Sequence, residues 1–179
     1  MDSDQNFGLH GKLAEYIDFA ASKMKSTLQL GNNGTCAFKH DRGRMEFAVE
    51  LREGSDIVYF YSPICKVPCH FPEQFFEKLL ENNLHGIANS QAGSGLDSKV
   101  QNIVLTYSIS INHLDTLPFE NILLNFVQTA EKAAINTGKW IEEIASKYTL
   151  SDEESEEENS EAVKNMKIRV QHGRSNRVN

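Results

Sequence analysis

The alternation of apolar and polar residues around position 105 constrains the fold of this chain more than any other feature. Apolar side chains occupy every second position from Ile103 to Ile111. Side chains of a β-strand point alternately to the two faces of a sheet, so this pattern predicts a strand with one buried and one solvated face. A second alternation over residues 45–51 predicts another strand of the same kind. We therefore expect one antiparallel sheet with helices packed on it.

Three strands are expected to form an antiparallel meander in the first half of the chain, because only short turns separate them. The strands are residues 35–40, 45–51 and 57–64, and the turns are residues 41–44 and 53–56. Residues 87–99 are expected to hold a short, poor strand followed by a turn, just before the alternating strand.

Three helices complete the predicted fold. Apolar residues at steps of three and four, beginning at Leu9, predict an amphipathic helix that ends near Gly31. A second helix is expected after Pro72 and a third over residues 118–148. The order α-β-β-β-α-β-β-α predicts an α+β domain with one twisted antiparallel sheet, which spans residues 1–150.

The composition of the chain changes at Ser151. The stretch SDEESEEENSEA contains seven acidic residues and no basic ones, and a mildly basic stretch follows it. Such a segment has too little apolar surface to fold alone, so residues 151–179 are predicted to be a flexible tail. Two interpretations stay open: a disordered tail that keeps the protein soluble, or a segment that binds a partner.

Charge and composition narrow the classes of partner. The formal net charge of −7 repels nucleic acid and anionic membrane surfaces. No run of 18 apolar residues and no signal-peptide pattern is present, and the three cysteines form no disulfide framework. We expect a soluble protein of a reducing cytoplasm, without nucleic acid as a partner and without membrane insertion.

Two glycines close to a lysine suggest a phosphate-binding loop, but their spacing argues against one. Gly93 and Gly95 precede Lys99, whereas a phosphate-binding loop has the spacing G-x-x-x-x-G-K-[ST] between a strand and a helix. Here Val100 follows the lysine and a strand is expected next, so no helix N-terminus would direct its amides at a phosphate. We interpret the glycines as a bend.

No pattern of residues predicts catalysis, a metal or a cofactor. The candidate metal ligands are Cys65, Cys69, His70 and His85, but C-x3-C-H is not a usual zinc spacing and no second pair completes four ligands. Cys36 with His40 is the nearest approach to a thiol nucleophile with a base, and Cys36 is better explained as a core residue. We expect a protein that is not an enzyme, with a small-molecule enzyme as the least favoured alternative.

Several stretches, taken in order, form a recognisable pattern. They are an amphipathic helix that ends at Leu30-Gly31, the hairpin Cys36-Ala-Phe38 with GRMEFAVEL, then IVYFYSPI, FFEKLLENNLHG, AGSGLDSKVQNIVLTYSI and LPFENILLNFVQTAEKAAINTGKW. Their order resembles the class I type III secretion chaperones, the Tir-chaperone (CesT-like) family, over about residues 8–148. The acidic tail departs from a minimal member of that family.

The resemblance implies a homodimeric chaperone of the bacterial cytoplasm that works without ATP. Such proteins hold the N-terminal region of a secreted effector in an extended form and present it to the secretion machinery. The expected partners are an effector, a second copy of this chain and the ATPase of the secretion apparatus. The alternative is a regulator on the same fold that sequesters another protein.

The resemblance also implies two binding surfaces. An extended client could pair with the edge strand TCAFKH and insert apolar side chains into pockets. The expected effector-binding residues are Leu13, Ile17, Leu28, Leu30, Cys36, Phe38, Phe47 and Val49. The expected dimer contacts are Phe76, Leu80, Asn83, Leu84, Ile87, Val104 and Thr106, with asparagine amides bonding across a twofold axis. The same apolar residues could instead form one core, and the sequence leaves that alternative open.

Overall fold

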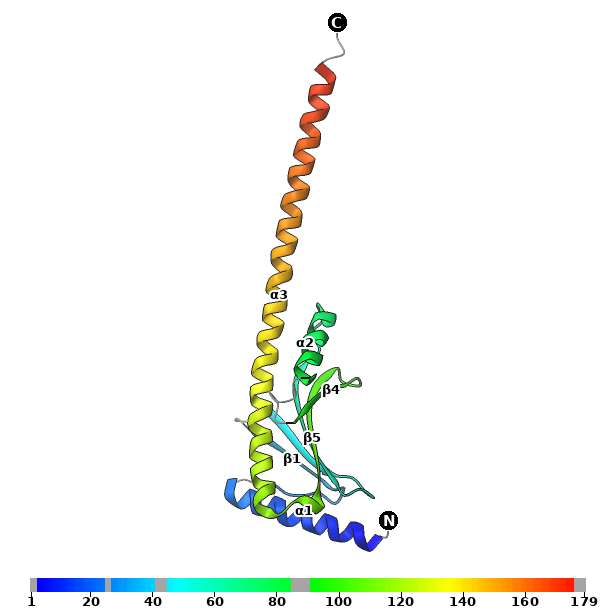
Figure 1. Ribbon diagram of the computed structural model, residues 1–179, viewed down its shortest axis with the longest axis vertical. Coiled ribbons are helices and arrows are strands. Elements are labelled where there is room, and N and C mark those ends of the chain that lie inside the picture. The colour runs from blue at the N-terminus through cyan, green and yellow to red at the C-terminus, as the bar shows by residue number, and fades with distance from the viewer. Residues whose placement is uncertain (1–2, 25–26, 41–44, 85–90, 176–179) are drawn as a thin grey trace. The chain divides into compact units, whose positions relative to one another are not determined.

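The computed structural model describes residues 3–24, 27–40, 45–84 and 91–175, and the side chains of residues 8–23, 27–40, 45–84 and 91–148. Contacts between Cα atoms divide the chain into two units, Met1–Trp140 and Ile141–Asn179. The first unit contains the sheet and its core (Figure 1). None of the described helices is long and apolar enough to cross a bilayer.

Five antiparallel strands form one sheet in the order β1-β2-β3-β5-β4. They are β1 (Thr35–His40), β2 (Met45–Leu51), β3 (Ile57–Lys66), β4 (Gly93–Asp97) and β5 (Asn102–Ser110). In this order β1 and β4 are the two edge strands. The register places Val49 opposite both Cys36 and Phe60, so these three side chains share one face of the sheet.

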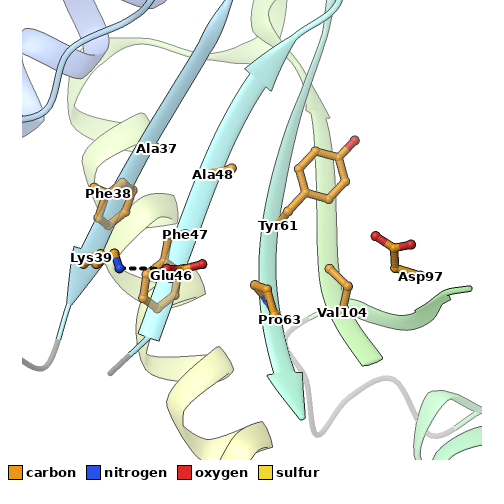
Figure 2. A pocket seen from close by; sticks show the side chains of 10 residues that line it. All are labelled: Ala37, Phe38, Lys39, Glu46, Phe47, Ala48, Tyr61, Pro63, Asp97 and Val104. Carbon is orange, nitrogen blue, oxygen red and sulfur yellow. Dashed lines mark ion pairs between the residues drawn. The ribbon is translucent and has the colours of Figure 1, made fainter. Parts of the chain in front are cut away.

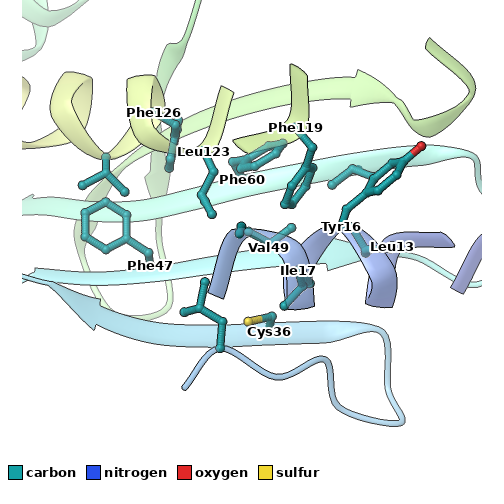
Figure 3. Packing of buried hydrophobic residues seen from close by; sticks show 14 of the residues in the cluster. Leu13, Tyr16, Ile17, Cys36, Phe47, Val49, Phe60, Phe119, Leu123 and Phe126 are labelled. Carbon is teal, nitrogen blue, oxygen red and sulfur yellow. The ribbon is translucent and has the colours of Figure 1, made fainter. Parts of the chain in front are cut away.

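Two helices and the strands enclose the core. The helices are α1 (Ser3–Met24) and α3 (Thr116–Ser175). The ring of Phe60 lies 5.9 Å from that of Phe119 and 5.7 Å from that of Phe126, and Leu13 and Ile17 of α1 are buried beside them (Figure 3). Apolar residues of α1 therefore face the same side of the sheet as the first turns of α3.

The loop between β5 and α3 is tied to α1 by polar contacts. The 3-10 helix η3 (Ile111–His113) follows β5, and the ammonium group of Lys12 donates to the carbonyl oxygen of Ile111 at 3.1 Å. The hydroxyl of Tyr16 donates to the carbonyl oxygen of Leu114. The carbonyl oxygen of Ile111 also accepts from the Leu114 amide at 3.2 Å, so the loop is held both by its own backbone and by side chains of α1.

The helix α2 (Pro72–Leu84) lies beside β4 (Figure 1). Its buried residues are Phe75 and Leu79. The ammonium group of Lys78 lies 5.7 Å from the centre of the Trp140 ring on α3, a cation–π contact. The helix is thus held by the sheet on one side and by α3 on the other.

The predicted fold class, strand order along the chain and antiparallel pairing are confirmed. The predicted end of the first helix is wrong, because α1 ends at Met24 although the apolar pattern runs to Leu28. Leu28 still reaches the core, from a segment that belongs to no helix or strand. The predicted turn at residues 41–44 lies outside the described residues.

The predicted end of the third helix at Tyr148 is also wrong, since α3 continues to Ser175. The sequence between Lys139 and His172 contains neither glycine nor proline, and glutamate, lysine and alanine all favour helices. That the segment from Ser151 onward is flexible stays a prediction.

Candidate protein-binding site

The thiols are poor candidates for chemistry. Burial raises the pKa of the Cys65 thiol to about 11, and burial also raises the pKa of Cys36, partly offset by a hydrogen bond from the backbone of Gln29. Both thiols are therefore protonated at neutral pH and weakly nucleophilic. The described residues contain no group of three or more His, Cys, Asp or Glu side chains that could hold a metal ion, and His85 lies outside them.

The glycine-rich stretch forms a strand and a turn. Gly93 and Gly95 belong to β4, and the amide of Lys99 donates to the Asp97 carboxylate at 3.0 Å in the turn that follows. The next element is β5, so the backbone has no helix N-terminus that could bind a phosphate.

The outer edge of β1 offers backbone groups for pairing. The amide of Leu51 donates to the carbonyl oxygen of Gly34 at 2.9 Å. In an antiparallel ladder bonded and non-bonded pairs alternate, so the N–H and C=O groups of Thr35, Ala37 and Lys39 point away from β2. These groups form the surface to which another strand could bond.

The turn before β1 occupies the first of these positions. The amide of Gly31 donates to the carbonyl oxygen of Thr35 at 2.9 Å, and the amide of Thr35 donates to the side-chain oxygen of Asn33 at 3.3 Å. Gly34 has a φ of +74°, and a Cβ there would collide with the carbonyl oxygen of Leu51, so this turn requires glycine. Within the part of the chain that the structure describes, the open part of the edge is therefore Ala37 and Lys39.

A hollow of about 480 Å³ lies beside this open part of the edge (Figure 2). Ala37 and Ala48 are paired across β1 and β2, and their small side chains leave the space. An ion pair of 2.8 Å between Lys39 and Glu46 lies at the hollow. The complete lining is Ala37, Phe38, Lys39, Glu46, Phe47, Ala48, Tyr61, Pro63, Asp97 and Val104.

An aromatic cluster continues the same face of the sheet. The Tyr59 and Tyr61 rings are stacked with centres 6.0 Å apart, and the Arg52 guanidinium lies 4.7 Å from the centre of the Tyr59 ring. Arg52 also donates to the Tyr61 hydroxyl at 3.0 Å and to the Glu50 carboxylate at 3.2 Å. Tyrosine and arginine held rigidly in this way are typical of binding hot spots. No binding role was predicted for these residues, although the aromatic residues on both faces of IVYFYSPI were a signal for one.

Most residues predicted to bind an effector lie in the core of the single chain. Leu30 and Phe38 are half-buried. The other six are buried: Leu13, Ile17, Leu28, Cys36, Phe47 and Val49. Phe38 and Phe47 are the predicted effector-binding residues that also line the hollow.

The residues predicted for a dimer contact are dispersed over α2 and the sheet. Leu80 and Leu84 are 65% and 82% exposed, one turn apart on α2, and Phe76 is half-buried one turn earlier. Val104 lines the hollow, and Thr106 donates to the carbonyl oxygen of Gly93 at 3.3 Å. Ile87 lies outside the described residues.

Asn83 is bonded within its own chain. Its side-chain amide makes two hydrogen bonds of 2.9 Å to the backbone of Ser94, because β4 lies directly beside α2. An asparagine amide has two N–H donors and two oxygen lone pairs, so the bonding of Asn83 across a twofold axis stays a prediction.

Comparisons with solved structures place this arrangement among proteins of known fold. One similar chain comes from the ExsC–ExsE complex, with 20% sequence identity, a TM-score of 0.56 and coverage of 73% of this chain and 92% of that chain. A second comes from the HopA1–SchA chaperone–effector complex, with 18% identity, a TM-score of 0.57 and coverage of 74% and 97%. A third comes from the heterodimeric ExoU–SpcU complex of the Pseudomonas aeruginosa type III secretion system, with 17% identity, a TM-score of 0.52 and coverage of 69% and 95%.

Comparisons of the amino-acid sequence identify the family to which this chain belongs. No curated protein sequence matches the chain. The model of the Tir chaperone protein (CesT) family, however, matches residues 18–134, which is more than half of the chain and includes the whole sheet. The resemblance seen in the sequence is confirmed, and this chain belongs to the Tir chaperone protein (CesT) family.

Proposed function

We propose that this protein is a type III secretion chaperone that binds an extended segment of a secreted effector and keeps it competent for secretion without using ATP. Membership of the CesT family supports the proposal, as does the similarity to chains solved in chaperone–effector complexes. The observation that carries it is the open edge of β1 at Ala37 and Lys39 beside an apolar hollow.

The client would add a strand to the sheet at β1. Its backbone would bond to the outward N–H and C=O groups of Ala37 and Lys39, and every second side chain would face the hollow. Four backbone bonds contribute about 4 kcal/mol at roughly 1 kcal/mol each. Since association itself costs at least about 4 kcal/mol, apolar side chains in the hollow must supply most of the affinity.

A proline in β1 tests this mode of binding. Ala37→Pro removes one outward N–H but no bond to β2, whereas Cys36→Pro removes an N–H that points to β2. The client is first identified by affinity purification from the native cell and mass spectrometry, and its binding segment is then titrated by calorimetry. We expect Ala37→Pro to weaken binding about tenfold without unfolding the protein, and Cys36→Pro to destabilise the fold. Unchanged affinity in a folded Ala37→Pro variant would contradict strand addition at β1.

We also propose that the chain forms a homodimer through α2, which leaves the hollow in the sheet to the client. Leu80 and Leu84 are 65% and 82% exposed on one helix, which is unusual for the surface of a monomer. A twofold dimer buries this face of α2 in both copies. Light scattering should give a mass of about twice 20.2 kDa.

The proposal also covers the cellular compartment of the protein and its lack of enzymatic activity. We propose that the protein acts in the bacterial cytoplasm, where its free thiols Cys36, Cys65 and Cys69 stay reduced. It has no enzymatic activity of its own in this proposal, and the ATPase of the secretion apparatus receives the complex. Residues 1–150 form the working domain, and residues 151–179 are dispensable for its folding.

A further inference from the structure

The outer edge of β4 is closed by the side chain of Asn83. The Asn83 amide nitrogen, in the last turn of α2, donates to the carbonyl oxygen of Ser94 at 2.9 Å. The Ser94 amide donates to the Asn83 side-chain oxygen, also at 2.9 Å. In an antiparallel sheet, the two residues of a hydrogen-bonded pair exchange the same two bonds, because the N–H of each donates to the C=O of the other. The asparagine amide therefore occupies the place of a paired strand residue.

This position matters because β4 is the second edge strand of the sheet. Ser94 is opposite Leu105 in the register, but its N–H and C=O point to α2 and away from β5. An edge strand whose groups point outward is a template for another strand. The residues of β4 would favour such pairing, since Gly93 and Gly95 present no side chain and Leu96 is 48% exposed.

The two edge strands therefore differ in which of their outward backbone groups already have hydrogen-bond partners. At β1 the local turn occupies only Thr35, and Ala37 and Lys39 follow with outward backbone groups. At β4 the outward positions are Ser94 and Leu96, and the helix α2 supplies an amide to Ser94, the second residue of the strand. A strand that approached β4 would have to displace both Asn83 bonds before it could form its own.

We propose that Asn83 is a specificity-determining residue that closes β4 to strand addition and so restricts pairing to β1. The inference takes from the proposed function only that strand addition is the mode of client binding. Without the amide, the β4 edges of two copies become mutual templates, because an antiparallel pair of identical strands satisfies a twofold axis.

The test replaces Asn83 by leucine and by alanine. Asn83→Leu keeps the size of the side chain and raises the helix propensity but removes both bonds, and Asn83→Ala removes them without adding a large apolar side chain. Asn121→Leu, at an exposed asparagine of α3, is the matched control. At low protein concentration we expect the Ser94 amide to exchange its hydrogen about tenfold faster in both Asn83 variants, since one hydrogen bond is lost.

Measuring Ser94 exchange and molecular mass at several protein concentrations distinguishes two roles of Asn83, which are closing the edge of β4 and only holding α2 in place. If Asn83 closes β4, the Ser94 amide of both variants becomes protected again at high concentration, and light scattering shows a mass above that of the wild type. If Asn83 only holds the helix, exchange stays fast at all concentrations and the mass is that of the wild type. That second result, in variants that fold by circular dichroism, would overturn the proposal.

A cross-link gives an independent readout. Leu96→Cys is introduced together with Cys69→Ser, which removes the exposed native thiol. We expect at least about fivefold more covalent dimer when Asn83→Leu is added, because paired β4 edges bring the two introduced thiols close together. Equal yields with and without Asn83→Leu would also overturn the proposal. No client is present in either experiment, so failure here leaves client binding at β1 to the separate Ala37→Pro test.

Discussion

Single side chains in this protein show which part of its stability comes from packing. Phe60 is buried between Tyr107, Phe119 and Phe126, with ring centres 5.7 to 5.9 Å from its own. Phe60→Ala should lower the free energy of unfolding by about 3–5 kcal/mol, because it leaves a cavity that rigid neighbouring rings cannot fill. Urea denaturation measures the loss. Leu117→Ala, at a residue that is 60% exposed, should change stability by less than about 0.5 kcal/mol.

Asp56 gives a prediction for acid conditions. Hydrogen bonds from the Ser110 hydroxyl at 2.7 Å and the Asn112 amide at 3.0 Å hold the pKa of the Asp56 carboxyl below its ordinary value of 3.8. A depressed pKa means stability that is present above the ordinary value and is lost as the pH falls below it. The urea midpoint of the wild type should therefore fall more steeply below pH 3.8 than that of Asp56→Asn. Ser110→Ala removes the main donor and should flatten the profile in the same direction.

At the scale of elements, α2 carries the two large apolar side chains with the highest exposure among the described residues, Leu80 at 65% and Leu84 at 82%. Leu80→Asp should convert the proposed dimer to a monomer at micromolar concentration, because it places two carboxylates at the interface and removes about 2–3 kcal/mol of apolar burial per copy. Sedimentation measures the change. Val100→Asp makes the same replacement at an exposed residue of the turn before β5 and should leave the mass unchanged. A persistent dimer in Leu80→Asp would show that the interface lies elsewhere.

The strands β2 and β5 were predictable from the sequence because apolar and polar residues alternate along them. Met45, Phe47, Val49 and Leu51 alternate with their neighbours, and β2 has those bounds. The end of α1 was not predictable in the same way, because Leu28 fits the helical period although it reaches the core from a segment outside any helix or strand. The binding residues were harder still. Leu13 and Phe38 are equally apolar, and only the packing of α1 on the sheet decides that one is buried while the other lines a hollow.

At the scale of the whole molecule, the segment from Ser151 to Asn179 provides a test of domain organisation. The core cluster draws its members from residues 13–133, so deletion of residues 151–179 removes none of them. The shortened protein should melt cooperatively within about 2 °C of the full chain, because stability follows the buried apolar surface. Scanning calorimetry measures the transition. A broad or absent transition would show that the segment supports the fold.

In the proposed mode of binding, the small floor of the hollow limits how strongly the sequence of a client affects its recognition. Ala37 and Ala48 would leave room for the client's side chain, while the edge of β1 would contact only backbone atoms, which are the same in every sequence. Recognition of this kind specifies extended shape and spacing and tolerates most substitutions. A client could drift in sequence over many generations without losing its chaperone, and one chaperone could serve several unrelated clients.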